Sequence, residues 1–298
     1  MPDEETLRQH PEFTQVVLDV NRSLKRFPPG IPYEQRVALQ DQLTNLILRV
    51  ITKYPHLRYY QGYHDVAVTF LLVVGEELSF RIMERLSTDH LRDCMEPTME
   101  KTSHLLNYIY PLIHRLHPRL CQYLEQSGVG TMFCLPWFLT WFGHSLNHYK
   151  DVVRLYDFFL ATHPLTPLYL SAVIVVHRQE EIFTTDCDMA SIHCLLSQIP
   201  DDLPFQTLIE ETLDLFEKFP PISVENEVIE RTNKEREQRK AEEAVRLAKR
   251  RHREVGLKWQ IQRYLPTSRT QLILIAMSVA LGLYTYLRGD SDHPFPAR

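Results

Sequence analysis

The sequence predicts an all-α protein with no sheet. Apolar residues recur at helical spacing through most of the first two-thirds of the chain, while alternation with a period of two is scarce. Proline and glycine cluster where these apolar patterns end, as in "MEPT", "THPLTP" and "IPDDLP". At 298 residues, the chain is long enough to form a large core.

The first helices follow from their apolar stripes and their breaks. A helix is expected from Phe13 to Leu24, ended by "FPPGIP", because proline removes a backbone donor and disfavours helix before it. A second is expected at Tyr33–Lys53, followed by a buried central helix in "HDVAVTFLLVVG", which is nearly apolar all round. Further helices are expected at about 78–92, 98–125, 128–146, 149–161, 165–180, 187–198 and 203–217.

Composition excludes several classes of function. A formal net charge of -5 gives no reason to expect nucleic-acid binding. No Gly-rich phosphate loop occurs, so the chain is not expected to bind a nucleotide on its own. The five cysteines are widely spaced and fit reduced, mostly buried thiols; "DCDMASIHC" matches no standard zinc spacing.

The chain changes character after residue 225. Residues 1–225 form the expected helical domain, and 226–269 read as a charged, partly basic helical linker with opposite charges at helical spacing, such as Glu235 with Arg239. A solvated spacer is the main interpretation. Contact with anionic lipid headgroups is left open for the basic cluster, which contains Lys249, Arg250, Arg251 and Arg253.

The next segment, 270–287, carries no charged residue and is close to the length of a transmembrane helix. We expect a single C-terminal membrane anchor here, with the large domain in the cytosol because Lys and Arg precede the span. Residues 288–298 would form a short lumenal tail. The shortness of the span favours the thinner endoplasmic reticulum membrane.

Two short motifs carry the functional prediction. In "VVLDVNR", Asp19 and Arg22 lie three residues apart and therefore on one helical face. About forty residues later comes "YYQG", with Tyr59, Gln61 and Gly62. These motifs resemble the I-x-x-D-x-x-R and Y-x-Q-G fingerprints of the TBC domain, the family of Rab GTPase-activating proteins. The resemblance covers roughly residues 10–217 and includes a later block with Trp137, Thr140, Phe142, Arg154 and Asp157.

The resemblance implies that Arg22 is an arginine finger and Gln61 a glutamine finger, both supplied to a GTP-bound Rab partner. Such residue types suit the chemistry, because GTP hydrolysis depends on positioning water and on stabilising charge on the phosphates. Asp19 would restrain Arg22, and Tyr59, Gly62 and Asp65 would support the glutamine turn. GTP and Mg²⁺ would belong to the Rab, so no cofactor of its own is expected.

Some features depart from the family pattern. Only fifteen residues precede Val16, so we expect a TBC domain shortened at its N-terminus. Other segments of the sequence, such as "FGHSLNHYKDVVRLYDFFLATHP", resemble an endoplasmic reticulum-anchored member of the family. This implies regulation of vesicle traffic from the endoplasmic reticulum to the Golgi, with reticulon-type proteins as further partners. The alternative is a catalytically impaired Rab-binding module or a membrane-anchored scaffold.

Overall fold

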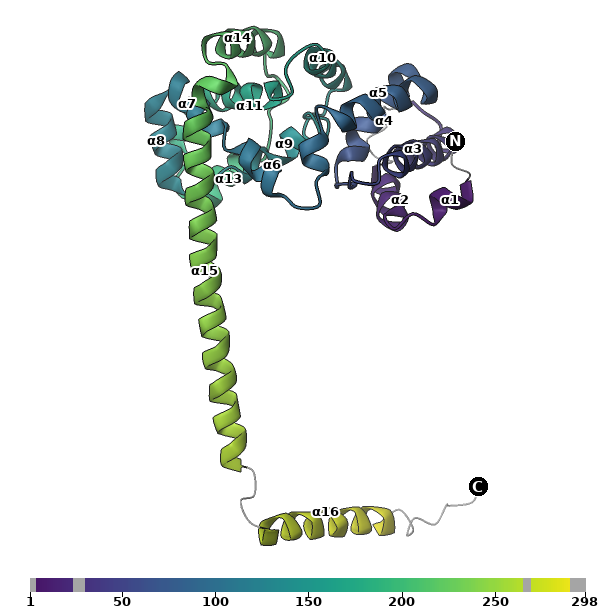
Figure 1. Cartoon of the computed structure of the whole chain (residues 1–298), viewed down its shortest axis with the longest axis vertical. Helices are drawn as coiled ribbons and strands as arrows, with labels where there is room; N and C mark the ends of the chain where they lie inside the picture. The colour runs from purple at the N-terminus through teal and green to yellow at the C-terminus, as the bar shows by residue number, and fades with distance from the viewer. Residues whose placement is uncertain (1–3, 24–29, 265–268, 290–298) are drawn as a thin grey trace, which may run out of the picture. The chain divides into compact units, whose positions relative to one another are not determined.

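The computed structural model describes residues 4–23, 30–264 and 269–289, and every regular element in these ranges is helical (Figure 1). The all-α prediction is therefore confirmed for the part of the chain that the structure describes. The chain divides into two compact units, Met1–Lys234 and Glu235–Arg298, which are described separately.

The N-terminal helices form close to where the apolar stripes predict them. They are α1 (Glu4–Arg8), α2 (Phe13–Arg22), α3 (Tyr33–Lys53), α4 (Tyr63–Val74) and α5 (Glu76–Thr88). Val16 and Val20 of α2 are fully buried, and α4 buries every position from Tyr63 to Leu71. The central helix is thus buried as expected. Residue 24, the expected end of α2, lies outside the described residues.

The single helix expected at 98–125 is instead three shorter ones. After the 3-10 turn η2 (Arg92–Met95) come α6 (Glu100–Leu106), α7 (Ile109–Leu116) and α8 (Pro118–Ser127). The backbone leaves the helical region at His117, immediately before Pro118, as the restriction on residues preceding proline requires. Apolar residues keep their helical spacing on both sides of His117, so the periodicity alone does not reveal the break.

The helix expected at 128–146 is also mostly absent. Only η3 (Met132–Cys134) and the short α9 (Leu135–Leu139) form, and the chain then turns through Trp141 and Phe142 with φ of 50° and 66°. Left-handed backbone is unfavourable for bulky residues, but both rings are buried, at 1% and 0% exposure. Burial of the two rings therefore holds this turn.

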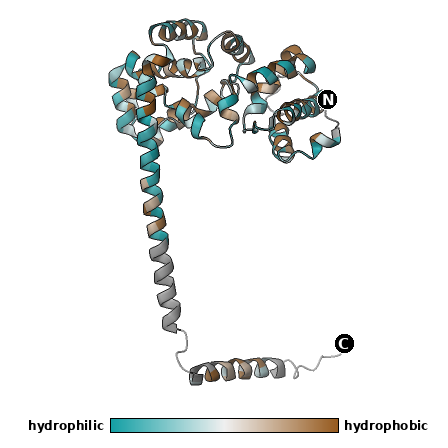
Figure 2. Ribbon diagram, in the orientation of Figure 1, coloured by the Kyte–Doolittle hydropathy of each residue, from teal (hydrophilic) through white to brown (hydrophobic). Residues whose placement is uncertain are grey.

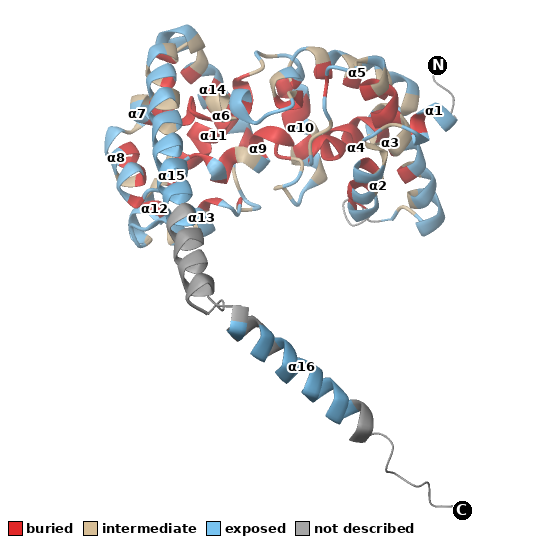
Figure 3. Cartoon of the chain, turned by 60° about the horizontal axis from the view of Figure 1, so that its bottom comes forward, coloured by how far each residue is buried: buried red, intermediate tan, exposed pale blue. Residues whose placement is uncertain are grey.

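The remaining helices of the first unit are α10 (Tyr149–Leu160), α11 (Thr166–His177), α12 (Gln179–Thr184), α13 (Met189–Leu196) and α14 (Phe205–Lys218). Helix α11 is buried from Thr166 to Val175 and packs against α7 and α14. Figure 3 shows buried residues running through α11, α9, α10 and α4, so the core extends along the whole unit.

Helix α15 (Pro221–Tyr264) begins inside the first unit. Val224 and Val228 are buried, the guanidinium of Arg231 lies 2.6 Å from the Glu125 carboxylate, and His104 Nδ1 lies 2.9 Å from the Thr232 hydroxyl. Residues 226–234, expected in the charged linker, are therefore part of the packed body. The charged residues that form ion pairs with α7 and α8 have the same sequence pattern as a solvated helix face, which is why the sequence alone places this stretch in the linker.

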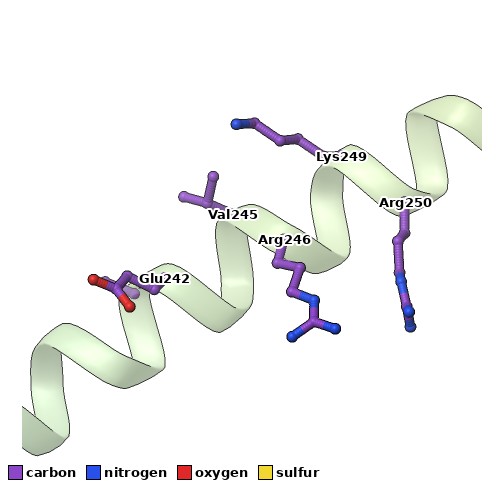
Figure 4. Close-up of a pocket in the computed structure, with 6 residues that line it drawn as sticks. Glu242, Val245, Arg246, Lys249 and Arg250 are labelled. Atoms are coloured by element: carbon purple, nitrogen blue, oxygen red, sulfur yellow. The ribbon is translucent and has the colours of Figure 1, made fainter.

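Residues 236–250 of α15 are exposed, and Figure 2 shows this described part of the helix as mostly hydrophilic with some hydrophobic positions. Figure 4 shows Val245 among Glu242, Arg246 and Lys249 on successive turns, with Arg250 pointing away from Val245. This agrees with a solvated charged helix. The side chains of Arg251 and Arg253, from the expected basic cluster, lie outside the described residues.

The prediction of a transmembrane helix at 270–287 is wrong. The segment forms α16 (Arg269–Gly289), but none of the described helices is at once sufficiently long and sufficiently apolar for a bilayer crossing. The absence of formal charge suggested the span, yet Gln271, Ser278 and Thr285 interrupt the apolar residues. The described helices therefore do not support the expected single-pass anchor. Most of the expected lumenal tail, residues 290–298, lies outside the described residues.

Candidate functional site

The last two turns of α2 hold an arginine out into solvent and an aspartate in the core. The Asp19 side chain is 1% exposed and that of Arg22 is 65% exposed. Their three-residue spacing lets Arg22 Nη2 donate to Asp19 Oδ1 at 2.8 Å. Arg22 Nε donates to the carbonyl oxygen of Leu18 at 3.2 Å. Two contacts on its own helix therefore orient the guanidinium while most of the side chain stays accessible.

Tyr59 links the glutamine turn to this aspartate. Its hydroxyl donates to Asp19 Oδ2 at 3.0 Å, and its backbone N–H donates to Glu12 Oε2 at 3.2 Å. Burial, with the negative charge of Asp19, raises the pKa of Tyr59 well above its ordinary value. The phenol therefore stays protonated and remains a donor to the buried carboxylate.

Gln61 is exposed on the turn that enters α4, between two fixed neighbours. Before it, the Tyr60 hydroxyl donates to the Leu139 carbonyl at 2.8 Å. After it, Gly62 has a φ of +112°, and a Cβ built there would lie 2.9 Å from Thr140 Cγ2. Only glycine satisfies both the backbone conformation and this close approach. The position of Gln61 is therefore set from both sides.

Asp65 lies in the first turn of α4 with its side chain 2% exposed. Its backbone N–H donates to the Gly62 carbonyl at 3.0 Å, and its Oδ2 lies 3.0 Å from His144 Nδ1. His64 Nε2 is 3.7 Å from Asp65 Oδ1. The carboxylate thus stands between two imidazoles directly beneath the glutamine turn.

Arg22 and Gln61 line one pocket of about 490 Å³. Asp19, Gly62 and Asp65 also line it, whereas Tyr59 does not and contacts Asp19 instead. The structure therefore brings together five of the six residues chosen from the sequence and places the sixth in contact with one of them. The other lining residues are Ser23, Tyr60, His64, Met99, Leu135, Pro136, Leu139, Thr140 and His144.

Sequence reasoning missed His144 and Met99 as pocket residues. His144 follows the left-handed turn after α9, and Met99 precedes α6, far along the chain from either motif. Their spacing relative to the motifs carries no signal, because tertiary packing alone brings them here. Among the described residues, no group of three His, Cys, Asp or Glu side chains is placed to hold a metal ion.

Comparisons with known proteins identify relatives of the chain. The sequence model of the Rab-GTPase-TBC domain matches residues 2–183. The chain is 55% identical over 225 residues to TBC1 domain family member 20 of Homo sapiens, covering 76% of this chain and 56% of that protein. It is 35% identical over 201 residues to GTPase-activating protein gyp10 of Schizosaccharomyces pombe, covering 66% of this chain and 53% of that protein.

A solved structure shares the fold. The crystal structure of the Ypt/Rab-GAP domain of Gyp1p superposes with a TM-score of 0.56 at 16% identity, over 69% of this chain and 73% of that one. The chain spans about half the length of the curated relatives that it matches, 56% of the human protein and 53% of gyp10. From the match over residues 2–183 and the identity to these relatives, the chain belongs to the Rab-GTPase-TBC domain family.

Proposed function

We propose that this protein is a GTPase-activating protein for Rab-family GTPases, with Arg22 and Gln61 supplied in trans to the partner's active site. One observation carries the proposal: an exposed arginine and an exposed glutamine line one pocket, with the guanidinium bonded to Asp19 and the residue before the glutamine bonded to Leu139. Family membership supports it, as does the GTPase-activating name of the relative gyp10.

The two side chains suit two separate needs of GTP hydrolysis. Negative charge spreads over the phosphate oxygens in the transition state, and a guanidinium is a permanent, forked cation that stabilises it where water is excluded. The carboxamide of Gln61 can donate and accept hydrogen bonds at once, so it can hold the attacking water without adding charge. GTP and Mg²⁺ are carried by the Rab, and this chain requires no cofactor of its own.

Four residues support the fingers. Asp19 restrains the Arg22 guanidinium, and the Tyr59 hydroxyl holds Asp19 in turn. Gly62 permits the backbone turn that presents the glutamine, and Asp65 fixes the first turn of α4 beneath it. A held guanidinium, and a held backbone beneath the amide, lose little freedom on entering the partner, which lowers the entropic part of the barrier.

Single-turnover hydrolysis tests the proposal directly. The 298-residue chain is added to a panel of purified GTP-loaded Rab GTPases, and phosphate release is followed. For the Rab that responds best, Arg22→Ala should lower the stimulated rate about 10³-fold or more, since an arginine supplied in trans contributes about 10³ to 10⁵. Gln61→Ala should also reduce it strongly. Arg85→Ala serves as the control, because Arg85 is an exposed helical arginine paired with Asp89, away from the pocket.

Two results would contradict the proposal. Unchanged stimulation by both finger variants would exclude the two-finger mechanism. Binding of a GTP-loaded Rab with no increase in hydrolysis, measured by pull-down beside the rate assay, would favour the alternative of a catalytically impaired Rab-binding module.

Residence at the endoplasmic reticulum, a role in transport from there to the Golgi and reticulon-type partners stay predictions, supported by sequence resemblance. Fluorescence imaging of the tagged chain beside an endoplasmic reticulum marker tests the first of them. A distribution independent of the marker would count against it.

A further inference from the structure

A histidine distant in sequence from both motifs contacts the acidic residue beneath the glutamine turn. His144 lines the pocket with Arg22 and Gln61, and its side chain is 52% exposed. Its Nδ1 lies 3.0 Å from Oδ2 of Asp65, a carboxylate that is 2% exposed. A carboxylate accepts and does not donate, so the Nδ1–H of His144 is the donor in this bond.

The backbone that carries His144 is fixed. Its N–H donates to Thr140 Oγ1 at 3.1 Å, and the same hydroxyl donates to the Pro136 carbonyl at 2.7 Å. The Tyr156 hydroxyl donates to the Thr140 carbonyl at 2.9 Å. The imidazole is therefore presented by an anchored turn, although the ring itself reaches solvent.

We propose that His144 is a positioning residue for Gln61, an inference that rests on the proposed function. Its bond to Asp65 holds the first turn of α4, where the Asp65 N–H is already bonded to the Gly62 carbonyl. Gly62 is the residue after Gln61. A shift of Asp65 is thus passed through one backbone hydrogen bond to the residue next to the glutamine.

A second histidine stands beside the same carboxylate but belongs to the arginine side of the site. The Tyr59 hydroxyl has one proton and gives it to Asp19, so it accepts from His64 Nδ1–H at 2.9 Å. His64 Nε2 lies 3.7 Å from Asp65 Oδ1, too far for a hydrogen bond. Loss of His144 is therefore expected to act on Gln61, while the contact between Asp19 and Arg22 remains.

A role in contacting the Rab is the competing explanation, because a half-exposed ring in the pocket could touch the partner. The two roles differ in kinetics. A contact made equally in the ground state and the transition state changes KM, whereas misplacement of a group used only in the transition state changes kcat.

The experiment compares His144→Leu with His144→Asn in the full chain. Asn places an amide N–H near the position of Nδ1, so it can keep the bond to Asp65, whereas Leu cannot. With the Rab that responds best as substrate, His144→Leu should lower kcat about tenfold with KM unchanged, as expected for loss of one hydrogen bond to a charged group. His144→Asn should restore most of kcat. His148→Leu, an exposed histidine on the same segment outside the pocket, should behave as the unaltered chain.

Two outcomes would overturn the proposal: unchanged kcat in His144→Leu, or a raised KM with kcat intact. Amide hydrogen exchange at residues 61–65 gives a readout that needs no Rab, and it should rise in His144→Leu and return toward the original in His144→Asn. If no Rab responds to the unaltered chain, the proposed function fails. The exchange pattern still decides whether His144 holds the turn, and unchanged exchange in the Leu variant would refute it.

Discussion

Substitution of Gly62 by alanine should carry two energetic costs at the glutamine turn, backbone strain and steric overlap. The backbone there has φ of +112° and ψ of -20°, a conformation that residues with a Cβ rarely adopt. This strain costs about 1–2 kcal/mol. The added Cβ would also lie 2.9 Å from Thr140 Cγ2, and such overpacking costs about 1–3 kcal/mol. We expect Gly62→Ala to lower the free energy of unfolding by about 3 kcal/mol.

Gly128→Ala is the matched control. Gly128 ends α8 with φ of +72°, and nothing lies within 4 Å of a Cβ built there. Gly128→Ala should lower the free energy of unfolding by about 1 kcal/mol, because it incurs backbone strain without steric overlap. Urea unfolding followed by tryptophan fluorescence measures both variants, and Trp137 and Trp141, which flank Thr140, report on this region.

Thr140→Ser tests the steric part. It removes Cγ2 but keeps the hydroxyl that donates to the Pro136 carbonyl and accepts from the His144 N–H. In the double variant, the cost of Gly62→Ala should fall by about 1–2 kcal/mol, which a double-mutant cycle reads as coupling. Equal costs for Gly62→Ala and Gly128→Ala, with no coupling to Thr140, would refute the close packing described for this turn.

Three further outcomes are expected. Tyr59→Phe removes the donor to buried Asp19, so it should lower the free energy of unfolding by about 1–2 kcal/mol and slow stimulated hydrolysis; unchanged values in both assays would argue against the link. Val228→Ala should cost about 2 kcal/mol because Val228 is fully buried, whereas exposed Ile229→Ala should change little; equal effects in urea unfolding would place residues 221–234 outside the packed body. Burial raises the pKa of the Cys94 thiol to about 12. Unfolded thiols ionise near pH 8.5, so the folded state holds the thiol proton more tightly than the unfolded state does. The contribution of Cys94 to the free energy of unfolding is therefore fully present below about pH 8.5 and is lost as the pH rises toward 12. Unfolding midpoints measured between pH 8 and 11 check the sign, and a midpoint that rises over this window contradicts it.

Local patterns account for the elements that the sequence predicts well. The stripe of Val16 and Val20 places α2, and the continuous apolar run after Gly62 identifies α4 as a buried helix. The bounds of α3 follow from Pro32 before it and from the break at Tyr54 after it. The polar residues chosen from the two motifs also meet, because the motifs end and begin helices that pack together.

Features that depend on packing across distant segments could not be predicted. The turn at Trp141 and Phe142 has left-handed backbone that neither residue prefers, and only burial of their rings offsets that strain. The helix break at His117 is different, because Pro118 is a local signal for it that the continuous apolar periodicity outweighed in the prediction. The contact between Asp65 and His144 spans 79 positions and joins a helix start to that left-handed turn. No spacing rule connects such residues.

The ion pair between Arg22 and Asp19 is better understood as an orienting contact than as a source of stability. One partner is 65% exposed and the pair is local, a setting in which ion pairs contribute little to folding. Asp19 nevertheless lies in the core at 1% exposure, where a carboxylate is costly unless its oxygens are bonded. Its Oδ2 is satisfied by Tyr59 from the other motif, which leaves Oδ1 for the guanidinium. The buried Asp19 carboxylate fixes the direction of the exposed Arg22 guanidinium, which can still enter a partner. This arrangement requires both motifs, because Tyr59 of the second motif satisfies the other oxygen of Asp19.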